Sequence, residues 1–189
     1  MSFQEDITQA LNTLNRGGVI LYPTDTVWGI GCDATNNTAV ERIYAIKQRN
    51  EARNMLTLVD SVDMLALYVE HIPDIALHLN DEAEKPLSII YPHARNLAAN
   101  LVAEDSSIGI RIVKDKFCRQ MIKAFGKPVV STSANMSGEN TPSFFDEISN
   151  EIKTVVDYVV RWRQDDRQPA KASSIIKLHA DGTFDVLRR

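Results

Sequence analysis

The chain has 189 residues, of which 44% are hydrophobic, and it carries a formal net charge of −4 at pH 7. This length predicts one domain with a real core, and the acidic balance excludes a general nucleic-acid coat protein, although local basic clusters could still bind phosphates. The sequence contains no apolar run long enough to span a bilayer and no signal-peptide pattern, and Cys32 and Cys118 are expected to be buried thiols, so we expect a soluble, cytoplasmic protein without a membrane partner.

Apolar periodicity predicts helices and strands that alternate along the chain. Helices are expected at residues 7–14, which Gly17 closes, at 117–125, which Gly126 ends, and at 143–152. Two more helices are expected to begin at a capping box formed by Thr38 and Glu41 and at an N-cap formed by Ser61. Strands are expected at residues 19–22, 56–59, 86–91, 107–113, 127–130, 174–178 and 184–187, and a turn at Asp181-Gly182 joins the last two. This order predicts a single α/β domain, residues 1–189, with a mixed sheet.

Residues 17–33, GGVILYPTDTVWGIGCD, are the most informative segment. Pro23 lacks a backbone donor, so the strand should stop there and leave the polar residues 24–26 at an open strand end. Gly29 and Gly31 would let a ligand approach the backbone. The segment is therefore typical of a binding site, although a β-bulge between two core strands explains it equally well.

The second polar segment is STSANMSG, residues 131–138, which is expected to form a loop directly after the strand 127–130. Its hydroxyls, its amide and its successive backbone N–H groups could bind an anion. Serine and asparagine are also ordinary turn residues, so a purely structural loop stays possible.

Two further positions place cations where apolar residues are expected. Lys47 continues an apolar helical stripe, so the helix is expected to end near Lys47 and to let Lys47 and Arg49 enter a shared pocket; a solvated helix end is the alternative. Arg111 lies in the apolar strand IGIRI, where a cation requires a partner, a ligand or an exposed face.

The segments YPTDTVWGIGCD, KQR, SSIGIRI, STSANMSG and ASSIIKL follow one another in the order of the YrdC-like threonylcarbamoyl-AMP synthase family, which this chain resembles over roughly residues 17–188. The resemblance implies an open, twisted α/β sheet, flanked by helices, around a large concave cavity. It implies a nucleotidyltransferase that condenses L-threonine, bicarbonate and ATP to threonylcarbamoyl-AMP and pyrophosphate. It also implies a separate transferase complex that modifies tRNA with this product, and a possible weak tRNA contact.

The resemblance also implies roles for individual residues. Lys47 and Arg49 would be catalytic, and ATP would enter with Mg²⁺ but without a metal held by the protein. Nucleotide contacts would come from Lys47, Arg49, Arg53, Ser107, Ser131, Ser133, Asn135 and Arg188, and threonine contacts from Thr24, Thr26, Arg111 and Ser173. Tyr22 and Trp28 would line the cavity or pack in the core.

Some residues depart from the family pattern. Asn50 follows the Lys-x-Arg motif where the family commonly has proline, and Glu84-Lys85-Pro86 replaces a usual Pro-Gly-Pro. A divergent or non-catalytic paralogue that binds nucleotide or RNA therefore stays open as the alternative. The charged segment 161–167 is expected to be a solvated loop, or a mobile lid by the resemblance.

Overall fold

The computed structural model describes residues 2–48, 55–168, 172–179 and 181–189. In these ranges the helices are α1 (Phe3–Asn15), α2 (Asn37–Ile46), α3 (Val62–Tyr68), α4 (Asp74–Glu82), α5 (Lys116–Phe125) and α6 (Asn150–Val155), with a 3₁₀ turn η1 (Phe145–Glu147). The strands are β1 (Ile20–Tyr22), β2 (Gly29–Gly31), β3 (Leu56–Val59), β4 (Leu87–Tyr91), β5 (Ile108–Ile112), β6 (Val129–Ser133), β7 (Tyr158–Val159), β8 (Ser174–Leu178) and β9 (Phe184–Arg188). None of the helices in these ranges is both long and apolar enough to cross a membrane.

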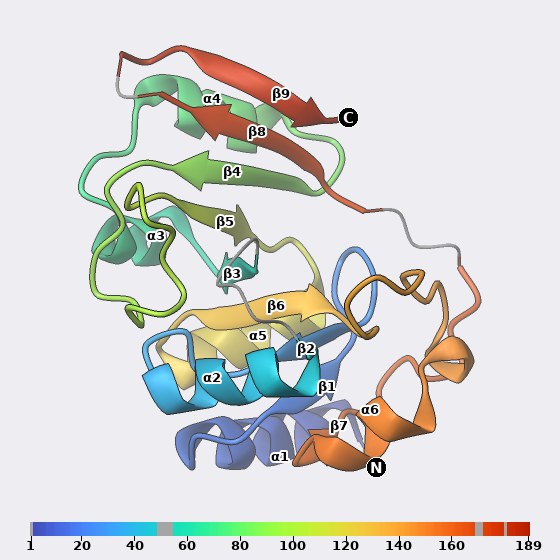
Figure 1. Cartoon of the computed structure of the whole chain (residues 1–189). Helices are drawn as coiled ribbons and strands as arrows, with labels where there is room; N and C mark the ends of the chain where they lie inside the picture. Colours follow the sequence, from blue (N-terminus) through green and yellow to red (C-terminus); the bar gives the residue numbers. More distant parts are fainter. Residues whose placement is uncertain (1, 49–54, 169–171, 180) are drawn as a thin grey trace.

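The strands form one sheet in the order β7-β1-β2-β6-β3-β5-β4-β8-β9 (Figure 1). Of the strand pairs in the described ranges, three are parallel (β1 with β7, β3 with β5, β4 with β8) and the other five are antiparallel, so the predicted mixed sheet is confirmed. Strand β6 comes late in the chain but lies between β2 and β3, and it thereby joins the two halves of the sheet.

Two apolar layers hold the sheet. Helices α1 and α5 pack together on one face, against side chains such as Tyr22, Leu58 and Val129, while α2, α3 and α4 cover neighbours such as Val59 and Val130. Adjacent strand residues fall into different layers because successive side chains point to opposite faces. In Figure 1, α2 lies in front of the sheet and α5 behind it.

Several local predictions are confirmed by backbone geometry. Strand β1 ends at Tyr22, directly before Pro23. The hydroxyl of Ser61 accepts from the N–H of Met64 and so caps α3, and Gly126 ends α5 with a φ of +72°. Strands β8 and β9 form the expected antiparallel hairpin.

Other local predictions are wrong. The N-cap of helix α2 lies two residues before the expected one, Thr38, because the side chain of Asn36 accepts from the N–H of Ala39 and so caps the helix. The helix expected at 143–152 is divided into η1 and α6, because the hydroxyl of Ser149 caps α6 and begins a new helix there. The strand after Lys127 continues through Ser133, so part of the expected polar loop is strand. Strands β2 and β7 and helix α4 were not predicted.

Candidate substrate cavity

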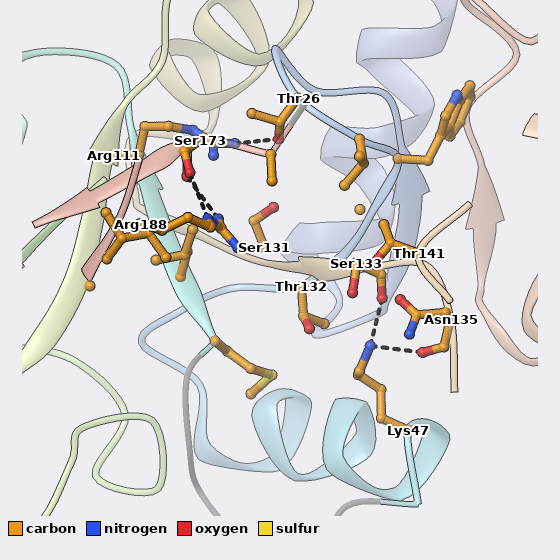
Figure 2. Close-up of a pocket in the computed structure, with 18 of the residues that line it drawn as sticks. Thr26, Lys47, Arg111, Ser131, Thr132, Ser133, Asn135, Thr141, Ser173 and Arg188 are labelled. Atoms are coloured by element: carbon orange, nitrogen blue, oxygen red, sulfur yellow. Dashed lines mark hydrogen bonds between the residues drawn. The ribbon is translucent and has the colours of Figure 1, made fainter. Parts of the chain in front are cut away.

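The described residues enclose a cavity of about 550 Å³ at one end of the sheet face that α1 and α5 cover. Leu58 and Val129 pack beneath α5, whereas Leu56 and Ser131, two positions along the same strands, line the cavity. Because alternate residues of a strand share a face, the helices cover one end of this face and leave the other end open. Figure 2 shows side chains from several strands converging on this space.

The cavity brings together most of the residues that the sequence singled out. Eight of them line it: Thr26, Lys47, Arg111, Ser131, Ser133, Asn135, Ser173 and Arg188. Apolar walls complete it, from Val27, Trp28, Met55, Leu56, Ile90, Ile175 and Leu187. No carboxylate is among the described lining residues, so three cations and several hydroxyls give the cavity its polar character.

Lys47 lies at one end of the cavity, directly after the last residue of α2, as the broken apolar stripe predicts. Lys47 is only 3% exposed, and its Nζ donates to the carbonyl oxygens of Ser133 (2.6 Å) and Asn135 (2.8 Å) (Figure 2). The ammonium group therefore ties the end of α2 to the end of β6. Arg49 and Arg53, the other two expected phosphate contacts, lie outside the described residues.

Strand β6 and the loop after it form the part of the cavity wall next to Lys47. Ser133 is paired with Gly29 of β2, and Ser131 is paired with Leu56 of β3, so the two hydroxyl residues belong to a strand rather than to a free loop. The amide of Asn135 donates to the carbonyl oxygens of Met136 and Glu139, both at 2.9 Å, which fixes its orientation. Its Oδ1 is buried, with no hydrogen-bond partner among the described residues.

Arg111 lies at the other end, and its side chain is 2% exposed. Its Nη2 is 2.9 Å from Oδ1 of Asp25 and 3.3 Å from Oγ1 of Thr26. Thr26 lines the cavity, while Thr24 lies behind it, with the two hydroxyl oxygens 3.0 Å apart. The cation in the apolar strand thus has a partner, which is one of the three explanations that the sequence allowed, and it also borders the cavity.

The C-terminal hairpin closes this end of the cavity. Arg188 donates from Nε to the carbonyl oxygen of Ser173 (2.8 Å), and its Nη2 is 3.4 Å from the hydroxyl of Ser173. That hydroxyl is also 2.9 Å from the hydroxyl of Ser88 on β4. The last strand of the sheet therefore contributes directly to the cavity wall, as its position beside β8 requires.

The sequence model of the Sua5/YciO/YrdC protein family, which is described as "Telomere recombination", matches residues 12–189 of this chain. This chain belongs to that family. It is 34% identical over 166 residues to the threonylcarbamoyl-AMP synthase of Pseudoalteromonas translucida (strain TAC 125), an alignment that covers 85% of this chain and 87% of that protein.

Solved structures of the Sua5/YciO/YrdC family have the same fold. E. coli YciO superposes with a TM-score of 0.84 at 26% identity, over 98% of this chain and 89% of that one. The P. abyssi Sua5 structure complexed with L-threonine superposes with a TM-score of 0.82 at 20% identity, over 94% of this chain and 52% of that one. This chain therefore spans about half of that Sua5 chain, and a likeness at 20% identity shows the fold alone.

Ser107, like Thr24, is an expected contact that does not line the cavity. The hydroxyl of Ser107 donates to Oδ1 of Asp105 (2.5 Å), in a turn before β5, and this hydrogen bond holds the pKa of that carboxyl below its usual range. Gly109, two residues later on β5, does line the cavity.

The two aromatic candidates have different roles. Tyr22 is fully buried and donates its hydroxyl to the carbonyl oxygen of Val130 (3.0 Å), so it is a core residue, and burial raises its pKa well above the usual value. Trp28 lines the cavity and packs on Phe145, with their ring centroids 4.9 Å apart.

The two glycines of the first segment also differ. Gly29 lines the cavity, as predicted. A Cβ on Gly31 would lie 2.4 Å from the carbonyl oxygen of Val130, so that glycine is required by strand packing and not by a ligand. The register of β1 with β2 is regular, and a loop connects them in place of a bulge.

The segment 161–167 is more firmly held than the expected solvated loop. The buried carboxylate of Asp6 accepts from the N–H groups of Arg161 (3.1 Å) and Trp162 (2.7 Å). Arg163 donates to the carbonyl oxygen of Thr24 (3.1 Å) and pairs with Asp115. These contacts fix the segment against the loop that carries Thr24.

Sequence reasoning missed several lining residues, among them Thr132 and Thr141, and the apolar wall from Met55, Ile90 and Ile175. Thr132 stood within the quoted STSANMSG segment, but its side chain was not singled out. The apolar wall carries no sequence signal, because Ile90 and Ile175 have the same pattern as any core strand residue.

Proposed function

We propose that this chain is an L-threonylcarbamoyladenylate synthase. The observation that carries the proposal is one cavity with a cation at either end, Lys47 beside β6 and Arg111 beside the β1–β2 loop, with hydroxyl groups between them. The relatives named threonylcarbamoyl-AMP synthase, at 31–34% identity over most of the chain, support the same activity.

The reaction needs little covalent chemistry from the protein. The amine of threonine condenses with bicarbonate to give a carbamate and water, and a carbamate oxygen then bonds to the α-phosphorus of ATP. The bond from that phosphorus to the bridging oxygen breaks, and pyrophosphate leaves. Catalysis of this kind rests on positioning two anions and stabilising charge at phosphorus, which is the chemistry of lysine, arginine and hydroxyl donors.

The two ends of the cavity suggest how the substrates divide it. ATP would lie on the Lys47 side, with its phosphates near Lys47, Arg49 and Arg53 and its other contacts from Ser131, Ser133 and Asn135. Arg188, which lies at the Arg111 end, would contact the nucleotide from across the cavity. L-Threonine would lie on the Arg111 side, with its carboxylate near Arg111 and Ser173 and its hydroxyl near Thr26. Thr24 would act through Thr26, since it lies behind that residue.

Mg²⁺ would enter as the ATP complex. The described lining residues offer oxygen atoms of Ser131, Ser133, Asn135 and Thr141 but no carboxylate, and no group of three or more His, Cys, Asp or Glu residues comes together in the described ranges. That donor set fits a metal held mainly by phosphates.

The product is a mixed anhydride, a class of compound that water hydrolyses readily. We therefore propose that a separate threonylcarbamoyl-transferase complex takes it from this protein for the modification of tRNA, in the cytoplasm.

The test is pyrophosphate release from ATP and Mg²⁺, with and without L-threonine and bicarbonate. We expect release that requires both and that L-serine at the same concentration does not replace. Binding of ATP without release would instead identify a non-catalytic paralogue, the alternative that Asn50 and the Glu84-Lys85-Pro86 segment leave open.

A further inference from the structure

The ion pair of Asp25 with Arg111 is the least satisfied polar contact beside the cavity. Asp25 lies in the loop between β1 and β2, with its side chain 10% exposed, and its Oδ1 is 2.9 Å from Nη2 of Arg111. Neither carboxylate oxygen of Asp25 accepts a hydrogen bond of good geometry from the described residues, and Nε of Arg111 also lacks a partner there. Arg111 lines the cavity, but Asp25 does not.

A buried carboxylate without hydrogen-bond donors is unfavourable unless an opposite charge compensates it. Here that charge is Arg111, so the two charges largely cancel at this end of the cavity. The guanidinium group nevertheless keeps donors that Asp25 does not occupy, since Nη2 is the nitrogen that contacts Asp25 and Thr26 in the described part of the chain. This end can therefore offer directed hydrogen bonds while it carries little net positive charge.

We propose that Asp25 makes the Arg111 end of the cavity selective for a zwitterionic amino acid over a phosphate group. A carboxylate accompanied by an ammonium group is bound by the free guanidinium donors at little electrostatic cost. A polyphosphate brings several negative charges close to the buried carboxylate of Asp25, which repels them. Asp25 is a positioning residue, because it acts on the ligand through Arg111.

This inference rests on the proposed function, and it explains a difficulty that the function raises. One cavity lined by cations must hold ATP and threonine at the same time, and a polyphosphate would otherwise compete for both cationic ends. A carboxylate behind one of the two cations directs the phosphates to the other end without blocking the amino-acid site.

The experiment compares Asp25→Asn with the unaltered protein, because asparagine keeps the shape and removes the charge. Inorganic tripolyphosphate is the probe, since it resembles the phosphates of ATP and cannot react. In the unaltered protein we expect it to compete with ATP and not with L-threonine. In Asp25→Asn the phosphates of ATP are no longer repelled from the Arg111 end and compete there with L-threonine. We therefore expect the KM for L-threonine to rise about tenfold with a smaller change in kcat, and tripolyphosphate to become competitive with L-threonine as well.

The matched control is Asp33→Asn. Asp33 is also buried (its side chain is 6% exposed) and ion-paired, to Lys127 at 2.7 Å, but it does not line the cavity. We expect it to lower stability while leaving the inhibition pattern unchanged. If Asp25→Asn leaves both the KM for L-threonine and the inhibition pattern unaltered, the inference is wrong even though the synthase activity stands.

A second variant covers the case in which Asp25→Asn does not fold, as judged by circular dichroism. Asp25→Glu keeps the negative charge but displaces it, so L-threonine binding should weaken while tripolyphosphate still fails to compete with it. Competition in Asp25→Glu would overturn the inference. Failure of the proposed function looks different, because the unaltered protein would then show neither threonine-dependent pyrophosphate release nor L-threonine binding by calorimetry.

Discussion

Tyr91, on β4, is a single residue that makes stability depend on alkaline pH. Its hydroxyl accepts from Nδ2 of Asn80 (3.3 Å), and burial raises its pKa to about 12, an effect that the hydrogen bond from Asn80 partly offsets. The folded state therefore disfavours the phenolate, whose pKa in the unfolded chain is about 10. The contribution of Tyr91 to the free energy of unfolding is fully present below pH 10 and is lost as the pH rises towards 12.

We predict that Tyr91→Phe reduces this loss of stability at alkaline pH. Between pH 10 and 12 the variant should lose about 2 kcal/mol less of its free energy of unfolding than the unaltered protein, because it has no phenol to ionise. Urea denaturation at pH 8, 10 and 12 measures the effect. Some slope will remain, since burial raises the pKa of Tyr22 as well; an identical slope in both proteins would contradict the assignment.

At the same scale, the sequence identified the cavity residues that violate a pattern. Lys47 and Arg111 were recognisable because each is a cation in an apolar repeat, and such local conflicts tend to mark functional sites. The family resemblance placed Thr26 and Arg111 in one site, but the ion pair of Arg111 with Asp25 could not be predicted, because the local pattern of a strand does not show which loop the assembled sheet brings to it. The position of Ser107 outside the cavity lining could not be foreseen for a related reason, since its motif does not reveal that Asp105 holds its hydroxyl in a turn.

At the scale of elements, the close approach of β2 to the paired strand β6 depends on Gly31. A Cβ there would meet the carbonyl oxygen of Val130 at 2.4 Å and Cε1 of Tyr22 at 2.6 Å, and the first of these is backbone that cannot rotate away. We predict that Gly31→Ala lowers the free energy of unfolding by about 2 kcal/mol or more, measured by urea denaturation.

Gly29→Ala is the comparison on the same strand. Its Cβ would lie 3.1 Å from the hydroxyl of Ser131 and 3.4 Å from a methyl group of Thr24, both side-chain atoms with more freedom to adjust. We expect Gly29→Ala to lower the free energy of unfolding by less than Gly31→Ala does. We also expect it to raise the KM values for the substrates, because the added methyl group lies in the cavity wall. Equal losses in the two variants would mean that β2 and β6 separate more easily than their packing indicates.

Elements were predictable where the local signal was strong and unopposed. β3, α5 and the β8–β9 hairpin have clear apolar patterns with capping or turn residues at their ends. β7, with only Tyr158 and Val159, is too short to carry a pattern and exists because it pairs with β1. The start of α2 was misjudged because two capping residues, Asn36 and Thr38, lie within one turn and the sequence does not rank them.

At the scale of the whole molecule, the order of the strands was beyond prediction from the chain. β6 enters between β2 and β3, and this one insertion places the hydroxyls of the STSANMSG segment opposite Arg111 and beside Lys47. Local sequence determines what each strand end carries, whereas long-range pairing determines which ends meet.

The distribution of charge over the whole molecule separates the two candidate functions. The net charge is −4, and two of the three cations that line the cavity, Lys47 and Arg111, are buried, while Arg188 is exposed on the last strand, so we expect ATP to be recognised mainly inside the protein and not by a basic surface. A protein that binds RNA non-specifically neutralises many exposed phosphates, and its affinity falls steeply with salt, by roughly 10³-fold or more between 50 and 200 mM. We therefore predict that ATP affinity changes less than about tenfold over this range and that binding of unmodified tRNA is weak throughout, as measured by calorimetry and fluorescence polarisation. Tight tRNA binding at 50 mM salt that disappears by 200 mM, with no binding of ATP, would favour the RNA-binding paralogue over the synthase.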